Sequence, residues 1–161
     1  WTGLFNKNMF STFLDKNSFQ KTGFISPVGY SEDDSPKKLR KPWSELFFNN
    51  KLMPLDKTTI PEYREILDAV RLAPSGMNLQ PWRVIYNNNR FHFFVERKKG
   101  FIGVAIKTLV IDMQLVDLGI AMCHFDLISS EMSIDGKWFK DSDIEHPKNW
   151  QYIKTWIKKT S

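Results

Sequence analysis

The stretch that decides the fold is Ala73-Pro74-Ser75-Gly76-Met77-Asn78-Leu79-Gln80-Pro81-Trp82. It joins a segment with helical spacing to a β-prone run, and its Pro, Ser, Gly, Asn and Gln residues predict an irregular loop. A loop of this composition presents backbone N–H groups and small polar side chains without a bulky wall. Loops held rigidly by a scaffold are frequent places of ligand binding.

Two interpretations of this loop follow from its residues. Ser75 offers a hydroxyl group, Gly76 permits close backbone approach, and Asn78 and Gln80 each carry donor and acceptor groups. That set suits the mixed edge of a planar heterocycle or a polyol chain. The same residues also suit a rigid connector, in which Asn78 and Gln80 satisfy backbone groups. The residues alone leave both interpretations open.

The segment before the loop has the pattern of an amphipathic helix. Thr59-Ile60-Pro61-Glu62 matches a capping box, which predicts that the helix begins there. Pro74 disfavours helical geometry at Ala73, so the helix is expected to end at that residue. The apolar residues at helical spacing are Tyr63, Ile66, Leu67 and Val70.

Short β-prone runs follow the loop. Arg83–Tyr86 and Phe91–Glu96 flank Asn87-Asn88-Asn89, and Asn tolerates the left-handed backbone of a tight turn. These runs predict a β-hairpin. Two further strands are expected at Gly136–Phe139 and Tyr152–Ile157.

The remaining elements complete an expected α+β fold. Short helices are predicted at Asn8–Leu14 and Pro42–Phe48, a strand at Gly23–Gly29 and a loop at Ser31–Lys41. Lys107–Met132 is apolar nearly all round, which is typical of a helix buried in the centre of a domain or dimer. We therefore expect a mixed or antiparallel sheet packed by helices, with a long buried central helix.

Composition places the chain among ordinary globular proteins. Its 161 residues, 42 % apolar and 25 % charged, are enough for one domain over residues 1–161 with a substantial core. The net charge of +5 comes from 23 Lys and Arg against 18 Asp and Glu, and the two signs are mixed along the chain. A nucleic-acid partner would rest on this charge alone, and no dense basic stripe supports one.

No membrane or secretory segment is expected. The most apolar stretch, Leu109–Ile128, carries Asp112, Asp117 and Asp126, which excludes a bilayer-spanning helix. No basic start followed by an apolar run marks a signal peptide. The single cysteine, Cys123, allows no internal disulfide and fits a reducing cytoplasm.

Side-chain chemistry has little support in the sequence. The three histidines are scattered, and no paired Cys or His spacing predicts a metal site. We expect His92 at the surface, and His124 and Cys123 in the packing of the long helix. No Gly-x-Ser-x-Gly elbow, Walker loop or Gly-x-Gly-x-x-Gly motif is present. An enzyme of this kind would rely on a bound cofactor.

The sequence of the loop, together with several other segments of the chain, resembles a known family. Arg71–Val84 closely resembles the Pro-Ser-x-x-Asn-x-Gln-Pro-Trp segment that borders FMN in the nitroreductase family, and the chain is similar to its TM nitroreductase subgroup. The further matches run in family order along nearly the whole chain: Ser26–Tyr30, Arg40–Phe48, Asn89–Phe93 and Asp117–Phe125.

The resemblance also covers the first residues. Trp1-Thr2-Gly3-Leu4-Phe5 looks like the family's Trp-x-Gly-Gly-x-Phe segment, with Leu4 in place of the second Gly. In the family an Arg-rich motif that grips the FMN phosphate precedes this point. We therefore expect this chain to be the C-terminal portion of a nitroreductase-like protein, with Lys37, Lys38 and Arg40 as partial substitutes for the phosphate-binding arginines.

The resemblance implies a specific activity and site. FMN would take hydride from NAD(P)H and pass it to a nitroaromatic, a quinone or another small-molecule acceptor. The implied cofactor-binding residues are Thr2, Gly3, Pro74, Ser75, Gly76, Asn78, Gln80, Lys37 and Lys38. A homodimer or a missing N-terminal half would complete the site. The alternative is a truncated, non-catalytic module with weak or no FMN binding.

Overall fold

The computed structural model describes residues 30, 39–97, 112–140 and 144–159. Apart from Tyr30, these residues belong to one compact unit, Lys38–Ser161. The helix expected at Asn8–Leu14 and the strand expected at Gly23–Gly29 lie outside the described residues. The prediction of one domain over residues 1–161 stays a prediction.

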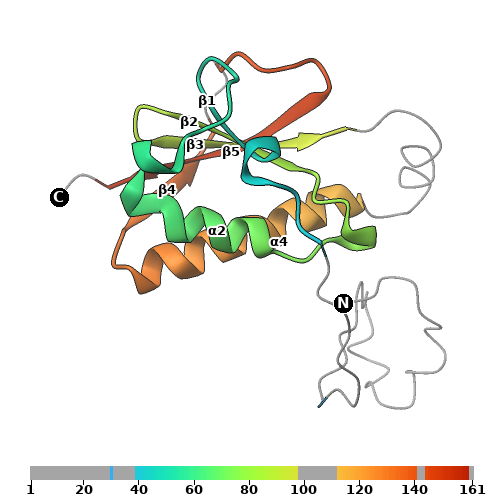
Figure 1. The fold of residues 1–161 in the computed structure, drawn as a ribbon, viewed down its shortest axis with the longest axis horizontal. Coiled ribbons are helices and arrows are strands. Elements are labelled where there is room, and N and C mark those ends of the chain that lie inside the picture. The colour runs from blue at the N-terminus through green and yellow to red at the C-terminus, as the bar shows by residue number, and fades with distance from the viewer. Residues whose placement is uncertain (1–29, 31–38, 98–111, 141–143, 160–161) are drawn as a thin grey trace, which may run out of the picture. The chain divides into compact units, whose positions relative to one another are not determined.

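A five-stranded mixed sheet forms the centre of the unit (Figure 1), in the order β1-β2-β3-β5-β4. β1 and β2 are parallel, and the other neighbouring strands are antiparallel. The strands are β1 (Phe47–Asn49), β2 (Trp82–Asn87), β3 (Arg90–Glu96), β4 (Gly136–Phe139) and β5 (Trp150–Lys158). The predicted hairpin and the two later strands are therefore confirmed, with β5 longer than expected.

Two α-helices lie side by side against one face of this sheet (Figure 1): α2 (Arg64–Leu72) and α4 (Met113–Glu131). α2 lies in the crossover from β1 to β2, as a parallel pair of strands requires. α4 follows β3 and precedes β4. The observed α+β fold with a mixed sheet and packed helices confirms that part of the fold prediction.

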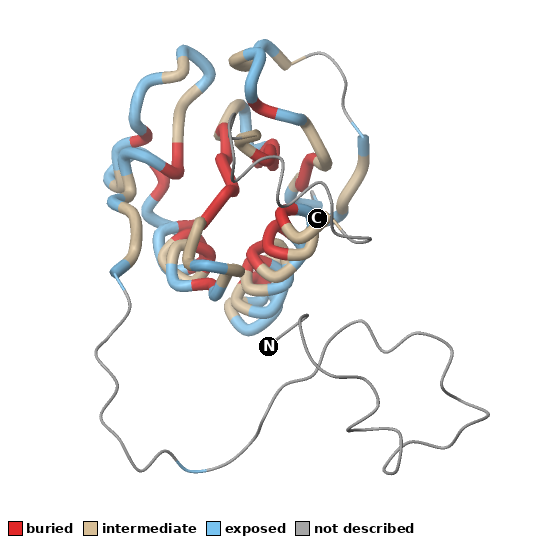
Figure 2. Tube along the Cα trace, turned by 90° about the vertical axis from the view of Figure 1, so that its right-hand side faces the viewer, coloured by how far each residue is buried: buried red, intermediate tan, exposed pale blue. Residues whose placement is uncertain are grey.

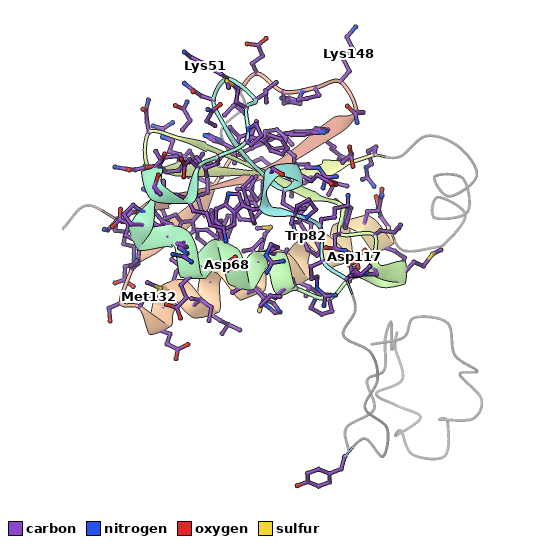
Figure 3. All side chains as sticks on the ribbon, in the orientation of Figure 1. Lys51, Asp68, Trp82, Asp117, Met132 and Lys148 are labelled. Carbon is purple, nitrogen blue, oxygen red and sulfur yellow. The ribbon has the colours of Figure 1, made fainter. Side chains whose placement is uncertain are left out.

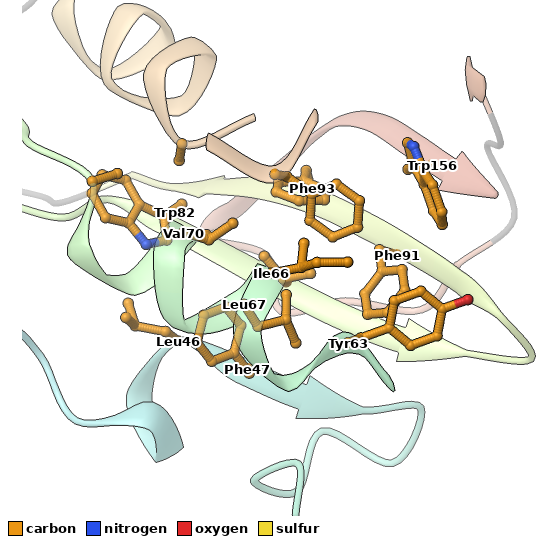
Figure 4. Packing of buried hydrophobic residues seen from close by; sticks show 14 of the residues in the cluster. Leu46, Phe47, Tyr63, Ile66, Leu67, Val70, Trp82, Phe91, Phe93 and Trp156 are labelled. Atoms are coloured by element: carbon orange, nitrogen blue, oxygen red, sulfur yellow. The ribbon is translucent and has the colours of Figure 1, made fainter. Parts of the chain in front are cut away.

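The main core fills the space between the helices and the sheet. In Figure 2 the buried parts of both helices face the sheet, and their outer sides are exposed. Aromatic rings dominate this core: Phe91 packs on Tyr63 at 4.7 Å between ring centroids and on Phe125 at 5.2 Å. Figure 4 shows much of the cluster, including Leu46, Phe47, Ile66, Leu67, Val70, Trp82, Phe93 and Trp156.

The opposite face of the sheet is also covered, which corrects one expectation. Ile85, Phe94 and Trp150 form a second apolar cluster there. His92 alternates with residues of the main core and so lies on this second face, where it is 2 % exposed. Its Nδ1 lies 2.8 Å from Thr155 Oγ1. The prediction of a surface His92 was wrong because it assumed a sheet with one face in water.

The long helix differs from its prediction in extent and burial. Asp112 has an extended backbone and caps the helix, so α4 begins at Met113, and residues 107–111 of the expected helix lie outside the described residues. Leu127 is 63 % exposed, and Cys123 is exposed as well. The helix is therefore buried on one face only, and the expected packing role of Cys123 was wrong. His124 is half-buried, so it belongs neither fully to the core nor to the surface.

The start of α4 is tied to the end of β3 by a bidentate ion pair. Arg97 Nη2 lies 2.7 Å from Asp112 Oδ2, and Arg97 Nη1 lies 3.0 Å from Asp112 Oδ1. The hydrogen bond from Arg97 lowers the pKa of Asp112 below its ordinary value, so the carboxylate that caps α4 stays ionised. This pair fixes the helix that carries Asp117.

Two local helix predictions were wrong for identifiable reasons. Pro42–Phe48 contains only a 3-10 turn at Trp43–Glu45, because Phe47 and Phe48 pair with β2 as strand β1. The capping box does not form either. Thr59 ends a 3-10 turn that Asp56 caps through Thr58 N–H, and α2 begins later, at Arg64. Its end at Leu72, with Ala73 as the C-cap, agrees with the prediction.

Candidate functional site

The Ala73–Trp82 loop connects the end of α2 to the start of β2 and is anchored in the core at both ends. Ala73 and Trp82 are fully buried. Between them Pro74 is exposed and Met77 is 78 % exposed, while Ser75 and Gly76 are half-buried. The loop therefore presents a short exposed face, Pro74–Met77, on a base that the core holds in place.

The loop backbone adopts a rarely populated geometry. Gly76–Asn78 forms a 3-10 turn, and within it Met77 has φ 52° and Asn78 has φ 54°. Gln80 also has a positive φ, of 46°. Left-handed geometry costs on the order of 1 kcal/mol for each non-Gly residue, so it persists only where surrounding contacts enforce it. The contacts that do so here come from two sides of the loop.

On one side, the amides of Asn78 and Gln80 bind the segment Leu39–Lys41. Asn78 Nδ2 donates to Leu39 O at 2.9 Å, and Lys41 N donates to Gln80 Oε1 at 2.7 Å. Gln80 Nε2 donates to Asn78 O at 3.0 Å, and Gln80 is only 3 % exposed. These bonds match the rigid-connector interpretation for the two amide side chains.

Arg40 joins the same segment to the end of α2. Its Nε and Nη2 donate to Leu72 O at 3.2 and 3.1 Å, and its Nη1 donates to Asn78 Oδ1 at 3.3 Å. A cation at the C-terminus of a helix satisfies a free carbonyl and interacts favourably with the helix dipole. Arg40 therefore fixes the point where the helix gives way to the loop.

On the other side, the carboxylate of Asp117 on α4 accepts the backbone N–H of Gly76 at 2.8 Å. Asp117 is 1 % exposed. Burial raises the pKa of Asp117 to about 6, against an opposing effect of the Gly76 N–H. In Figure 3 Asp117 lies at the same end of the unit as Trp82.

The exit of the loop is held by a buried cation. Arg83 is 4 % exposed, and its Nη1 donates to Gln80 O at 3.1 Å and to Trp82 O. Its Nη2 donates to Glu96 on β3. Burial lowers the pKa of Arg83, against the opposing charge of Glu96. The pair sets the direction in which the chain leaves the loop and enters β2.

The structure brings five of the predicted site residues together in this loop: Pro74, Ser75, Gly76, Asn78 and Gln80. Ser75 Oγ accepts from Gln80 N at 2.9 Å, and its hydroxyl has a proton to donate as well. Thr2, Gly3, Lys37 and Lys38 lie outside the described residues. Their predicted contacts with the cofactor stay predictions.

Sequence reasoning missed two residues that shape the site, Arg83 and Asp117. It expected Arg40 at the FMN phosphate, whereas the structure shows Arg40 bound to Leu72 O and Asn78 Oδ1. Asp117 had a usable signal, because it is a carboxylate on the face of an apolar helix that also carries buried Leu118 and Ala121. Such a position demands a hydrogen-bond partner. Nothing in the local sequence identifies Gly76 as that partner.

No other chemistry presents itself among the described residues. Within them, no group of three or more His, Cys, Asp or Glu side chains is placed to hold a metal ion. Of the helices in that part of the chain, none is long and apolar enough to cross a bilayer. The loop therefore remains the site with the strongest geometric support.

Comparison with a solved structure identifies a similar fold. The crystal structure of a putative nitroreductase from Thermotoga maritima MSB8 matches with a TM-score of 0.52 and 22 % sequence identity. The match covers 81 % of this chain but 46 % of the solved chain, so this chain spans about half the length of that protein. No curated protein matches the sequence.

The sequence also matches a family model. The model, described as Putative TM nitroreductase, covers residues 1–129, which include the whole Ala73–Trp82 loop and most of α4. The match takes in both partners of the contact between Gly76 and Asp117. The chain belongs to the Putative TM nitroreductase family.

Proposed function

We propose that this protein is an FMN-dependent oxidoreductase of the nitroreductase type. It transfers hydride from NAD(P)H to a nitroaromatic, a quinone or a similar small-molecule acceptor. The observation that carries the proposal is the exposed Pro74–Met77 face, held in a rare backbone geometry by contacts on two sides of the loop. Family membership supports the choice of a flavin as its ligand.

The residues of the exposed face fit one edge of a flavin. Pro74 provides a rigid apolar surface, Ser75 a hydroxyl donor, and Gly76 a backbone without a side chain. A flavin bound here would supply the hydride chemistry, which no described side chain provides. The chain would orient the ring, exclude water from its edge and keep Ser75 in place through the bond from Gln80 N.

Asn78 and Gln80 take a different part in this proposal. Their amides bind Leu39, Lys41 and each other, so they hold the wall of the site rather than reach the ligand directly. Thr2 and Gly3 are proposed to complete the ring contacts, and Lys37 and Lys38 to bind the phosphate. This chain spans about half the length of the solved nitroreductase it resembles, so we propose that a homodimer or a missing N-terminal half supplies the remaining contacts.

A flavin titration tests the proposal. The purified 161-residue chain is expected to quench the fluorescence of added FMN and to retain a flavin absorbance band after gel filtration. With NADH or NADPH it should then reduce a nitroaromatic or a quinone. Ser75→Ala is expected to weaken FMN binding several-fold, whereas Ser129→Ala, a buried serine on α4, serves as the matched control. A chain that takes up no FMN would contradict the proposal.

One observation favours the alternative of a non-catalytic module. The side chains of Asn78 and Gln80 are engaged within the protein, as a purely structural connector would require. In that case the fold would be stable and the Ser75→Ala variant would behave like the wild type toward FMN. The same titration therefore separates the two functions. Location in the cytoplasm is proposed for either one, and fractionation of cells tests it.

A further inference from the structure

A buried carboxylate on α4 reaches the backbone of the loop. Asp117 is 1 % exposed, and its Oδ1 accepts the N–H of Gly76 at 2.8 Å. Gly76 is the first residue of the 3-10 turn that carries Met77 and Asn78. The contact therefore joins a helix of the core to the point where the loop enters its unusual geometry.

The location of this carboxylate is costly without a partner. Leu118 and Ala121, on the same buried face of α4, are 1 % and 0 % exposed. A carboxylate in such surroundings loses its hydration and is tolerated when a hydrogen bond replaces it. Within the described residues, the hydrogen bond that Asp117 accepts comes from Gly76. The carboxylate and the loop therefore depend on each other.

The bond controls the residues that follow Gly76. Met77 and Asn78 have φ of 52° and 54°, a geometry that local sequence does not favour for Met. Asn78 N then donates to Ser75 O at 3.1 Å, which closes the turn. With the N–H of Gly76 fixed, the turn closes in one register, and the orientation of Pro74 and Ser75 is set.

We propose that Asp117 is a positioning residue for the flavin site. By holding the N–H of Gly76, it fixes the Pro74–Met77 face in the conformation that contacts the flavin. This inference rests on the proposed function and deepens it, because it assigns a role to a residue on α4, outside the loop motif. Asp117 itself does not touch the cofactor in this proposal.

Amide hydrogen exchange tests the contact without any cofactor. In Asp117→Ala the Gly76 N–H should exchange about tenfold faster or more, since a hydrogen bond to a charged group is lost. Asp117→Asn keeps an oxygen acceptor and should restore most of the protection. Asp126→Ala is the matched control, because Asp126 is also on α4 and accepts from Trp138 Nε1 at 2.8 Å. It should leave Gly76 unchanged.

The Val84 amide on β2 reports general loss of structure in the same spectra, because it donates to Leu46 O at 2.8 Å. Faster exchange at Gly76 with an unchanged Val84 supports the proposal. Equal exchange of Gly76 in the wild type and in Asp117→Ala overturns it. So does equal acceleration of both amides in Asp117→Ala together with no rescue by Asp117→Asn.

FMN affinity provides the second measurement. Asp117→Ala should weaken FMN binding about tenfold, and Asp117→Asn should bind within about threefold of the wild type, in parallel with the exchange data. Unchanged affinity in Asp117→Ala would overturn the link to the flavin. A wild type that binds no FMN, with Gly76 still dependent on Asp117, would overturn the proposed function and retain the role of Asp117 in positioning the loop.

Discussion

The two connections at the ends of β2 both use left-handed residues, yet different forces hold them. The Asn87–Asn89 turn places Asn88 and Asn89 at φ 49° and 57°, and both residues are exposed. The Ala73–Trp82 loop places Met77, Asn78 and Gln80 in the same region of backbone space. The turn is stabilised by the chemistry of its own residues, whereas the loop depends on distant ones.

The two connections differ in how far apart in sequence the contacting residues are. In the turn, Tyr86 OH donates to Asn89 Oδ1 at 2.8 Å, within the same hairpin. In the loop, Gly76 is bound by Asp117, and Gln80 is bound by Lys41. The Asn residues of the turn tolerate left-handed backbone geometry by themselves. The loop contains Met77 and Gln80, which do not, so contacts from other parts of the fold determine its conformation. Such specification is typical of functional loops.

The largest effect is expected where the loop is anchored in the core. Trp82→Ala should lower the free energy of unfolding by about 3–5 kcal/mol, because a fully buried indole is replaced by a cavity. Tyr86→Ala, at the turn end of the same strand, should cost less than about 2 kcal/mol, since Tyr86 is half-buried. Urea denaturation of the two variants measures both values.

Equal losses in these two variants would contradict the comparison. They would mean that the two ends of β2 contribute alike to stability and that the loop has no special anchor. As a control, the free energy of unfolding should fall with urea concentration at the wild-type slope in both variants, because a changed slope indicates a change in the unfolded state.

The second prediction concerns pH. The pKa of Asp117 is raised from 3.8 to about 6 in the folded protein. The folded state therefore holds the proton more tightly than the unfolded state does. The stability from this protonation is fully present below about pH 4 and is lost as the pH rises through about 6. The loss is on the order of 2–3 kcal/mol.

Asp117→Asn removes this titration. The stability of the wild type relative to the variant should fall between pH 4 and pH 7, which denaturation at a series of pH values measures. The Asn88→Gly variant, altered in the turn, should follow the wild type over the same range. A constant difference between the wild type and Asp117→Asn would show that Asp117 titrates at its ordinary pKa.

The elements that sequence predicted are those with local causes. The hairpin followed from alternation and from three Asn residues, and Pro74 placed the end of α2 correctly. The predicted capping box does not form, because Asp56 instead caps a 3-10 turn at Lys57–Thr59, before the expected helix start. Strand β1 was missed because its partner, β2, lies far along the sequence. Local patterns do not contain such pairings.

The candidate site divides in the same way. Resemblance to the family's loop motif identified the loop as a candidate site, and the residue types of Asn78 and Gln80 indicated a polar role. Their actual partners, Leu39 and Lys41, were not predictable, because segments distant in sequence meet only in the folded state. His92 shows the same limit: alternation placed it opposite the core correctly, but burial of that second face depends on Trp150 and its neighbours.

A smaller loss is expected when the amide clamp, the hydrogen bonds that the Asn78 and Gln80 side chains make with Leu39 and Lys41, is weakened. Gln80→Ala removes the hydrogen bond from Lys41 N–H to Gln80 Oε1 and should cost about 1–3 kcal/mol. Tyr86→Phe removes the hydrogen bond of the exposed turn and should change stability by less than about 0.5 kcal/mol. Thermal and urea unfolding measure both. If the two variants behave alike, the amide clamp does not hold the loop.

The smallest effect tests backbone strain alone. Met77 is 78 % exposed, so its side chain contributes little packing, and its φ of 52° disfavours any residue with a Cβ. Met77→Gly should therefore stabilise the protein by about 0.5 kcal/mol, the strain relieved less the added entropy of the unfolded chain. Asn88→Gly should change stability by only about 0.2 kcal/mol, because Asn already tolerates this geometry. Paired urea midpoints resolve the difference. A loss of stability in Met77→Gly would mean that the contacts from Asp117 and Gln80 act on a loop without strain, and the two connections of β2 would then differ only in burial.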